Sequence, residues 1–278
     1  MADTSEAPRL TFRSYKSDYK PVWCPGCGDF SVLNSILKAL TELQVKPEDT
    51  AIISGIGCSS RIPAYTSVYG FHGVHGRALA LASGLKLARP DLTVLATGGD
   101  GDGFSIGGNH FMHACRRNVD MTYIVMDNQV YGMTKGQASP TTAPEWEGSK
   151  LTPQGTGINP FQPLAIALAA GANFIGRGFA ADQNGVAKLI TEGVRHPGFS
   201  FIQVLSPCVT FRPEQRDWRD IVRPAPVEPT SNLSTAGKRL MGDDGFNTGV
   251  LFIGNRPSYV AESGGGTDLA EIEKSFAL

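Results

Sequence analysis

The sequence has few charged residues and no long apolar segment. Only 18% of its 278 residues are charged, and 25 basic residues against 26 acidic ones leave a net charge of −1. Such a chain has no bulk electrostatic attraction to nucleic acids or anionic membranes. No apolar run approaches the roughly 20 residues of a membrane span, and residues 1–6 lack the basic and apolar regions of a signal peptide. We therefore expect a cytoplasmic protein without nucleic-acid or membrane partners.

The five cysteines are few for a disulfide framework, and the cytoplasm keeps thiols reduced. They are therefore expected to be metal ligands, nucleophiles or core residues. A hydrophobic share of 41% is sufficient for one large core or two modest ones, and length alone does not choose between them.

Short apolar runs alternate with helical patterns over most of the chain. The runs cover 51–54, 92–97, 121–126 and 199–205. The helical patterns cover 77–87, 106–117, 163–170 and 184–195, together with a segment from Asp29, a candidate cap, to Leu40. This alternation predicts an α/β fold with a doubly wound, mostly parallel sheet. Such sheets bind ligands beyond the carboxyl ends of their strands, where two glycine-rich segments of this chain lie.

The composition changes after residue 212. Residues 223–229 are rich in proline, and residues 263–267 have the composition of a flexible linker. We expect one domain over 1–212 and an extended C-terminal tail over 213–278, which packs on the domain or on a partner subunit.

A glycine-rich segment with two aspartates, residues 98–109, leaves a predicted strand and enters a helix. Its backbone amides can approach a phosphate closely, and the helix dipole favours an anion. The aspartates would repel that phosphate unless a divalent cation lay between them. Asn128 follows Asp100 by 28 residues, a spacing that suits one helix and one strand. Asp100 and Asn128 can therefore ligate one metal ion from adjacent strand ends.

Two alternatives remain open at this segment. It can be an ordinary glycine-rich turn in which Asp102 caps a helix, or Asp102 can replace Asp100 as the ligand. A dinucleotide site is disfavoured, because no acidic residue follows at the required distance.

Gly-Asp-Gly, then a helix, a strand and Asn, resembles the thiamine-diphosphate signature. The resemblance implies a thiamine-diphosphate-binding fold, with Mg²⁺ held by Asp100, Asn128 and the carbonyl of Val130. It favours Asp100 over Asp102, because the enzymes resembled place the aspartate at this separation. The other residues expected at the cofactor are Gly57, Cys58, Ser59, His75, Gly99, Gly101, Asp102, Gly103, Gly132, Met133 and Thr134.

Four cysteines occur where they can converge. Cys24 and Cys27 form a Cys-x-x-Cys turn, and Cys58 and Cys208 lie near predicted strand ends. From spacing alone, a zinc ion and a [4Fe–4S] cluster are equally good interpretations. A thioredoxin-like redox pair is a third, disfavoured because no suitable strand precedes the turn. Cys115, inside a predicted helix, is expected to be a buried hydrophobic residue.

The motifs together resemble the β subunit of 2-oxoacid:ferredoxin oxidoreductases from about residue 19 to 212. They are Cys-Pro-Gly-Cys-Gly, Gly-Ile-Gly-Cys-Ser-Ser, His-Gly-Val-His-Gly-Arg-Ala, Gly-Gly-Asp-Gly-Asp-Gly, Gly-Gly-Asn-His-Phe and Tyr-Gly-Met-Thr-Lys-Gly-Gln-Ala-Ser-Pro-Thr. The resemblance implies that Cys24, Cys27, Cys58 and Cys208 ligate one [4Fe–4S] cluster. It also implies reversible, coenzyme A-dependent oxidative decarboxylation of a 2-oxoacid to an acyl-CoA and CO₂, with electrons passing through the cluster to ferredoxin. The loop at 131–141 favours 2-oxoglutarate, which would give succinyl-CoA, over pyruvate or a broad substrate range.

Two absences indicate a subunit of a larger enzyme. No convincing glutamate is present to activate the thiamine ring nitrogen, and we expect an α subunit to supply it. The dense cysteine run of a built-in ferredoxin is also missing, so a separate ferredoxin is expected to take the electrons. Arg61 and Lys135, which follow cofactor motifs closely, are predicted to bind the substrate carboxylates.

Two other functional classes remain open. A non-redox thiamine-diphosphate carboligase would not require four placed cysteines, and a zinc-stapled binding module would leave Asp100 and Asn128 unexplained.

Overall fold

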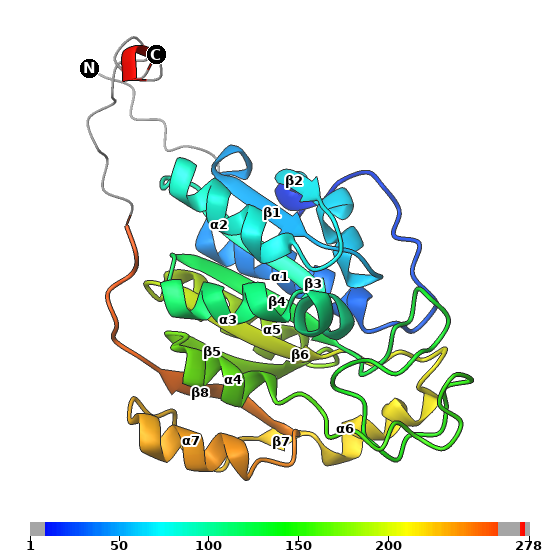
Figure 1. The fold of residues 1–278 in the computed structure, drawn as a ribbon. Coiled ribbons are helices and arrows are strands. Elements are labelled where there is room, and N and C mark those ends of the chain that lie inside the picture. Colours follow the sequence, from blue (N-terminus) through cyan, green and yellow to red (C-terminus); the bar gives the residue numbers. More distant parts are fainter. Residues whose placement is uncertain (1–8, 261–272, 276–278) are drawn as a thin grey trace.

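A computed structural model describes residues 9–260 and 273–275. Its eight-stranded sheet has the order β2-β1-β3-β4-β6-β5-β8-β7 (Figure 1). The strands are β1 (Thr50–Ser54), β2 (Tyr69–His72), β3 (Thr93–Gly99), β4 (Met121–Asp127), β5 (Phe174–Phe179), β6 (Phe199–Leu205), β7 (Arg223–Pro224) and β8 (Asn247–Ile253). All neighbouring strands pair in parallel except β5 and β8. The predicted doubly wound, mostly parallel sheet is confirmed.

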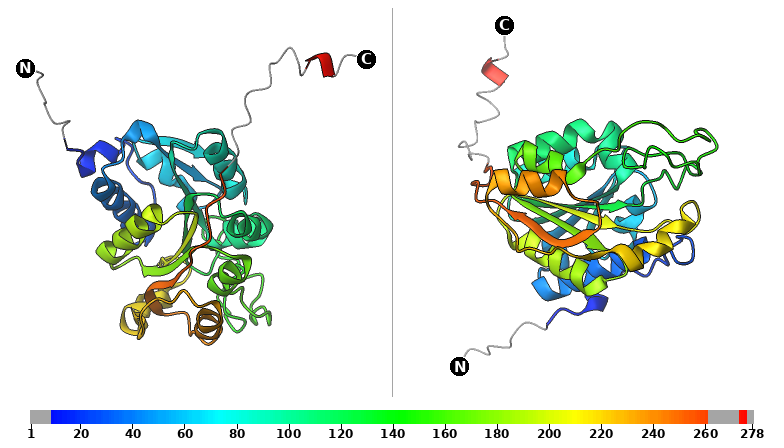
Figure 2. Two further views of the ribbon diagram at one scale, coloured as in Figure 1. Left: turned by 90° about the vertical axis from the view of Figure 1, so that its left-hand side faces the viewer. Right: turned by 90° about the horizontal axis from the view of Figure 1, so that it is seen from below.

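Helices cover both faces of this sheet (Figure 2). The helices α1 (Asp29–Leu43) and α5 (Gln183–Arg195) pack together on one face. The other face carries α2 (Ala78–Ala88), α3 (Gly108–Arg117), α4 (Pro163–Ala170) and α7 (Leu233–Met241). The short helix α6 (Trp218–Ile221) lies near the end of the sheet. No helix in 9–260 or 273–275 is long and apolar enough to cross a bilayer.

Alternate residues of the central strands supply two hydrophobic cores. Tyr123 and Val125 of β4 belong to the core beneath α3 and α4, while Ile124 and Met126 belong to the core beneath α1 and α5. Every residue of β4 is buried. This burial explains the continuous apolar run, because a parallel strand covered on both faces has no solvent-facing side.

The structure contains elements that the sequence patterns did not predict. The edge strand β2 is exposed along its whole length, and β5 carries two glycines and an arginine, which weaken a strand pattern. Asp29 does not cap α1, because Gly28 is the N-cap. Its buried carboxyl instead accepts a hydrogen bond from Ser206 Oγ at 3.0 Å.

The expectation of an extended tail after residue 212 is corrected for residues 213–260. This segment forms α6, β7, α7 and β8, and β8 pairs with β5 as part of the same sheet. The reason is apolar content: Phe252 of β8 and Ala236 and Leu240 of α7 enter the core beneath α4. Of the proline-rich residues 223–229, Arg223 and Pro224 form β7, and the others belong to the connection between β7 and α7. The glycine-rich residues 263–267 lie outside the described residues.

Candidate functional site

A small cavity of about 70 Å³ lies beyond the carboxyl ends of β1, β3 and β4. Its walls come from the segments that follow these strands and from His75. The lining residues are Ile56, Gly57, Cys58, Ser59, His75, Gly99, Asp100, Gly101, Asp102, Met126, Asn128, Val130, Tyr131, Gly132, Met133 and Thr134. All the residues predicted for the cofactor are therefore brought together, except Gly103.

Asp100 directly follows β3, and its side chain is buried. Its Oδ2 accepts hydrogen bonds from Ser139 Oγ and from Thr141 Oγ1, the latter at 3.0 Å. No side chain among the described residues donates a hydrogen bond to Asp100 Oδ1. One carboxylate oxygen is thus fixed by protein hydroxyls, while the other remains available to a ligand in the cavity.

Asn128 and Val130 lie one strand away, in the turn that follows β4. Asn128 Oδ1 accepts a hydrogen bond from the Val130 amide at 3.1 Å, and Gln129 between them has a left-handed φ of 55°. Within 9–260, the Val130 carbonyl accepts no hydrogen bond. Together with Asp100, these residues present carboxylate, amide and carbonyl oxygens, which are the ligand types that Mg²⁺ takes in proteins.

The charges around Asp100 also suit a cation. Burial and then the buried carboxylate of Asp127 raise the pKa of Asp100 above its usual value. Asp127 does not line the cavity, but its Oδ1 accepts a hydrogen bond from Thr141 Oγ1 at 2.8 Å. A divalent cation would offset the repulsion between the two carboxylates and favour their ionised forms. The residues present therefore fit a magnesium ion.

Asp102 is held differently. Its Oδ1 accepts hydrogen bonds from the amides of Ile56 at 2.9 Å and Gly76 at 2.7 Å, and lies 3.6 Å from His75 Nδ1. Its Oδ2 is buried without a hydrogen-bond partner, and burial raises the pKa of the carboxyl. Asp102 ties together two loops of the cavity, a role that Asp100 does not share.

Two glycines of the aspartate-rich turn have different neighbours. A Cβ atom on Gly101 would overlap the ring of Tyr131, whose hydroxyl donates to the Gly101 carbonyl at 3.2 Å. A Cβ atom on Gly103 would overlap the Tyr123 hydroxyl in the core. Gly103 is thus required for packing beneath the turn, and the prediction that it contacts the cofactor is not supported by its position.

Two hydrogen bonds join the three segments that carry the four cysteines, and a third closes one of these segments. The Cys27 amide donates to the Cys24 carbonyl at 3.0 Å and closes the Cys-x-x-Cys turn. Gly28 N donates to Pro207 O at 3.1 Å, next to Cys208, and Trp23 Nε1 donates to Cys58 O at 2.8 Å. Segments far apart in the sequence are therefore held together at one place.

The sulfur atoms themselves are close. The Sγ atoms of Cys208 and Cys58 lie 3.7 and 3.8 Å from the point that a Cβ atom on Gly132 would occupy. Burial, with Asp29 as the next cause, raises the pKa of Cys58 to about 11, and burial raises the pKa of Cys27 and Cys208. Other cysteines of the group contribute to each of these shifts. A positively charged group would favour the thiolates.

The arrangement of sulfurs bears on the choice between zinc and a cluster. In the described residues, no three His, Cys, Asp or Glu side chains are arranged to hold a single metal ion. Four thiolates around one zinc would each lie about 2.3 Å from it. The [4Fe–4S] cluster therefore stays a prediction. Cys115 is fully buried in α3, so its prediction as a core residue is confirmed.

The predicted carboxylate-binding residues lie outside the cavity wall. Arg61 belongs to the 3₁₀ segment Ser59–Tyr65, close enough to Cys58 to lower the pKa of that thiol slightly. Lys135 is exposed, with a left-handed φ of 82°. Their role stays a prediction.

Sequence reasoning missed several residues of the site. Tyr131 and Ile56 line the cavity, and Asp127, Ser139 and Thr141 support Asp100. Asp127 could have been found from the sequence, because it directly precedes Asn128 and also lies at the end of a predicted strand.

Comparisons with known proteins agree with this geometry. The family model "Thiamine pyrophosphate enzyme, C-terminal TPP binding domain" matches residues 55–204; thiamine pyrophosphate is another name for thiamine diphosphate. The 2-oxoglutarate synthase subunit KorB of Methanocaldococcus jannaschii is 46% identical over 190 residues, 68% of this chain and 70% of that protein. The chain belongs to the β subunits of 2-oxoacid:ferredoxin oxidoreductases.

Other β subunits of this family are longer than the present chain. The 2-oxoglutarate oxidoreductase subunit KorB of Mycobacterium tuberculosis is 47% identical over 199 residues, and the match spans 72% of this chain but 53% of that protein. The chain thus spans about half the length of that relative. A solved structure of 2-oxoglutarate:ferredoxin oxidoreductase from Magnetococcus marinus, with 2-oxoglutarate, coenzyme A and succinyl-CoA bound, superimposes with a TM-score of 0.89 at 38% identity. That match covers 99% of this chain and 98% of the solved chain.

Proposed function

We propose that this chain is the catalytic β subunit of a 2-oxoglutarate:ferredoxin oxidoreductase. The reaction converts 2-oxoglutarate and coenzyme A to succinyl-CoA and CO₂, and the two electrons released pass singly to ferredoxin. With a strong reductant, the same reaction runs in reverse and fixes CO₂. An α subunit completes the active site.

The main support for this proposal is that the cavity and the cysteines adjoin. Cys58 lines the cavity, and Gly132, also on its wall, lies against the sulfurs of Cys58 and Cys208. A group that releases electrons in the cavity would lie directly beside a metal cluster held by Cys24, Cys27, Cys58 and Cys208. A carboligase would not need four cysteines beside the cavity, and a zinc-stapled binding module would not need the cavity.

The residues of the cavity suggest how the chain would hold its cofactor. Thiamine diphosphate supplies a thiazolium ring that stabilises the electron pair left when CO₂ departs. Asp100, Asn128 and the Val130 carbonyl would hold Mg²⁺ against the diphosphate. Gly101 is held in place by Tyr131 and allows the diphosphate to approach the backbone closely. Asp102 fixes the loops that carry Ile56 and His75 on the opposite wall.

The choice of 2-oxoglutarate rests on the names of relatives. The proteins from Mycobacterium tuberculosis, Methanocaldococcus jannaschii and Magnetococcus marinus all have 2-oxoglutarate in their names. Relatives from Aeropyrum pernix and Sulfolobus are named for 2-oxoacids in general, and a pyruvate or broad-range enzyme is the second candidate. We retain Arg61 and Lys135 as the proposed carboxylate-binding residues.

The test is an anaerobic assay of the full chain, co-expressed with its α subunit. We expect brown protein with broad visible absorption and 2-oxoglutarate-dependent reduction of a viologen dye in the presence of coenzyme A. Dye reduction with pyruvate but not with 2-oxoglutarate would favour the second candidate, a pyruvate or broad-range enzyme. Colourless protein that binds thiamine diphosphate would support a carboligase, and colourless protein with stoichiometric zinc would support a binding module.

A further inference from the structure

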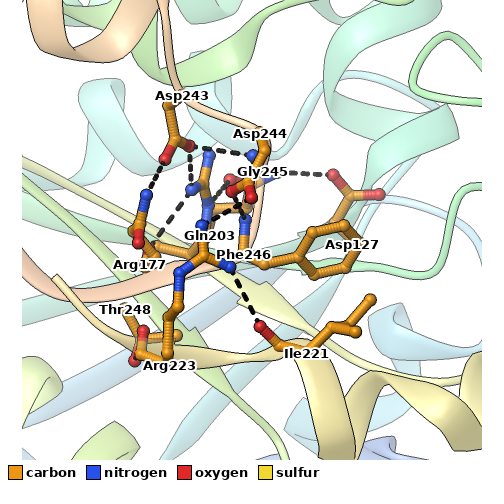
Figure 3. A network of polar contacts seen from close by, with 11 residues as sticks. Asp127, Arg177, Gln203, Ile221, Arg223, Asp243, Asp244, Gly245, Phe246 and Thr248 are labelled. Atoms are coloured by element: carbon orange, nitrogen blue, oxygen red, sulfur yellow. Dashed lines mark hydrogen bonds and ion pairs between the residues drawn. The ribbon is translucent and has the colours of Figure 1, made fainter.

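A chain of buried hydrogen bonds joins the three neighbouring strands β4, β6 and β5 (Figure 3). Gln203 Nε2 of β6 donates to Asp127 Oδ2 of β4 at 2.7 Å. Arg177 Nε of β5 donates to Gln203 Oε1 at 2.8 Å, and Arg177 Nη1 donates to Asp243 Oδ2. Asp243 belongs to the loop between α7 and β8. This chain therefore connects the C-terminal segment to the residue that precedes Asn128.

The direction of every hydrogen bond in this chain is fixed by its charged members. An arginine side chain only donates, so the Gln203 carbonyl must face Arg177. The amide group of Gln203 must then face Asp127. Asp243 in turn accepts from the Gly245 amide at 3.1 Å and from Asn247 Nδ2 at 2.6 Å, which fixes the position of Arg177. Reversing the side-chain amide of Gln203 would place its oxygen against a carboxylate.

At its other end, the chain reaches the proposed metal ligands through Asp127. Asp127 Oδ1 accepts from the Gln129 amide at 3.1 Å and from Thr141 Oγ1 at 2.8 Å. Gln129 lies between Asn128 and Val130, and Thr141 also lies against Asp100 Oδ2. The Thr141 hydroxyl has one hydrogen to donate. The orientation of Asp127 therefore affects both the turn at 128–130 and the hydrogen bonding of Asp100.

We propose that Asp243, Arg177 and Gln203 are positioning residues that orient Asp127 and so set the affinity of the cavity for the metal-bound diphosphate. This inference rests on the proposed function. The buried positions of Asp127, Arg177 and Gln203 support it, because a misaligned hydrogen bond there cannot be replaced by water. Residues that support metal ligands in this way typically change affinity by about 10- to 100-fold when they are replaced.

The direct test is Gln203→Glu in the full chain, co-expressed with its α subunit and depleted of cofactor. The glutamate retains the shape and the hydrogen bond from Arg177, but it presents an acceptor instead of a donor to Asp127. Calorimetric titration with thiamine diphosphate at fixed Mg²⁺ should show a dissociation constant about tenfold or more above wild type. The matched control is Asp244→Asn, next to Asp243, which breaks an exposed ion pair with Arg223 of β7. We expect the control to bind within twofold of wild type.

A second set of variants separates positioning from structural support. Arg177→Met leaves the buried Asp243 carboxylate without its cation, and adding Asp243→Asn removes that charge. If the chain is only structural, the double variant recovers its melting temperature and its cofactor affinity together. The proposal predicts recovery of the melting temperature alone, because nothing then orients Gln203.

These experiments distinguish a failure of the positioning role from a failure of the proposed function. Wild-type protein that binds no thiamine diphosphate would overturn the proposed function. Wild-type binding with unchanged affinity in Gln203→Glu would overturn the positioning role. Should Gln203→Glu fail to fold, wild-type affinity in the double variant would overturn it equally.

Discussion

The two halves of the proposed active site are built in different ways. The candidate magnesium ligands follow β3 and β4, which are adjacent parallel strands, so the sheet itself sets their separation. The cysteines come from three separate segments joined by a few hydrogen bonds. The carboxylate half is therefore an extension of a rigid element, while the cysteine half depends on contacts between loops.

The same comparison shows what the halves share. Each gathers acidic groups whose pKa is raised, the buried Asp100 in one half and the half-buried Cys27, Cys58 and Cys208 in the other. In both halves, a bound cationic group would stabilise the ionised forms of these side chains. We expect loss of the cofactor to loosen the cysteine half more than the carboxylate half, because Cys58 and Cys208 lie farther beyond the ends of their strands than Asp100 and Asn128 do.

Cys208→Ser should have the largest effect on activity, and it should affect the cysteine half only. The variant is expected to lose visible absorption, iron and viologen reduction, while thiamine diphosphate still binds with about the affinity of wild type. Cys115→Ala is the control, because Cys115 lies in the core of α3. A full iron content in Cys208→Ser would show that the cysteine half is misassigned.

Asp100→Asn should impair the carboxylate half of the site. We expect activity to fall about 100-fold or more, because the amide weakens a charged metal ligand, while the iron content stays at the wild-type value. Titration with thiamine diphosphate and Mg²⁺ measures the binding. Retained binding here, with lost binding in Asp102→Asn, would assign the metal to Asp102. Asp120→Asn, at the opposite end of β4, is a surface control.

Gly101→Ala tests how rigid the carboxylate half is. The added methyl group would overlap the Tyr131 ring, so the wall must shift and the affinity for thiamine diphosphate should fall by about tenfold, or 1.4 kcal/mol. Gly84→Ala in α2 is the matched control, because a methyl group there meets nothing and should stabilise the helix by up to about 1 kcal/mol. Equal cofactor affinity in both variants would mean that the wall adapts.

Trp23→Phe tests the loop contacts and should have the smallest effect. It removes the hydrogen bond to the Cys58 carbonyl, worth about 1 kcal/mol, and we expect faster loss of iron during storage with unchanged cofactor binding. Trp146→Phe, whose lost hydrogen bond to Glu214 lies at the surface, is the control. A stable cluster in Trp23→Phe would mean that the other loop contacts suffice.

Much of the carboxylate half could be predicted from the sequence. Asp100 and Asn128 follow apolar runs separated by one helix, and neighbouring parallel strands end at the same edge. The spacing of the cysteines was less informative, because it left zinc and a cluster equal until the resemblance was considered. The contact of Gly103 with the cofactor stays a prediction, because a glycine needed for packing and one needed for ligand approach look alike in a sequence.

The hydrogen-bond chain from Asp127 to Asp243 could not be predicted. Asp127 and Gln203 are 76 residues apart, and Gln203 and Arg177 are 26 apart. They meet only because the strand order is β4-β6-β5, which differs from the order in the sequence. Likewise, β8 joins the sheet next to β5 from a segment whose prolines and glycines suggested a tail.

The central claim is that the cavity delivers electrons to a cluster directly beside it. The most direct measurement is the visible spectrum of the anaerobic, oxidised complex after addition of 2-oxoglutarate, without ferredoxin or dye. Our account predicts bleaching of the cluster absorption together with release of CO₂. Release of CO₂ with an unchanged spectrum would contradict it.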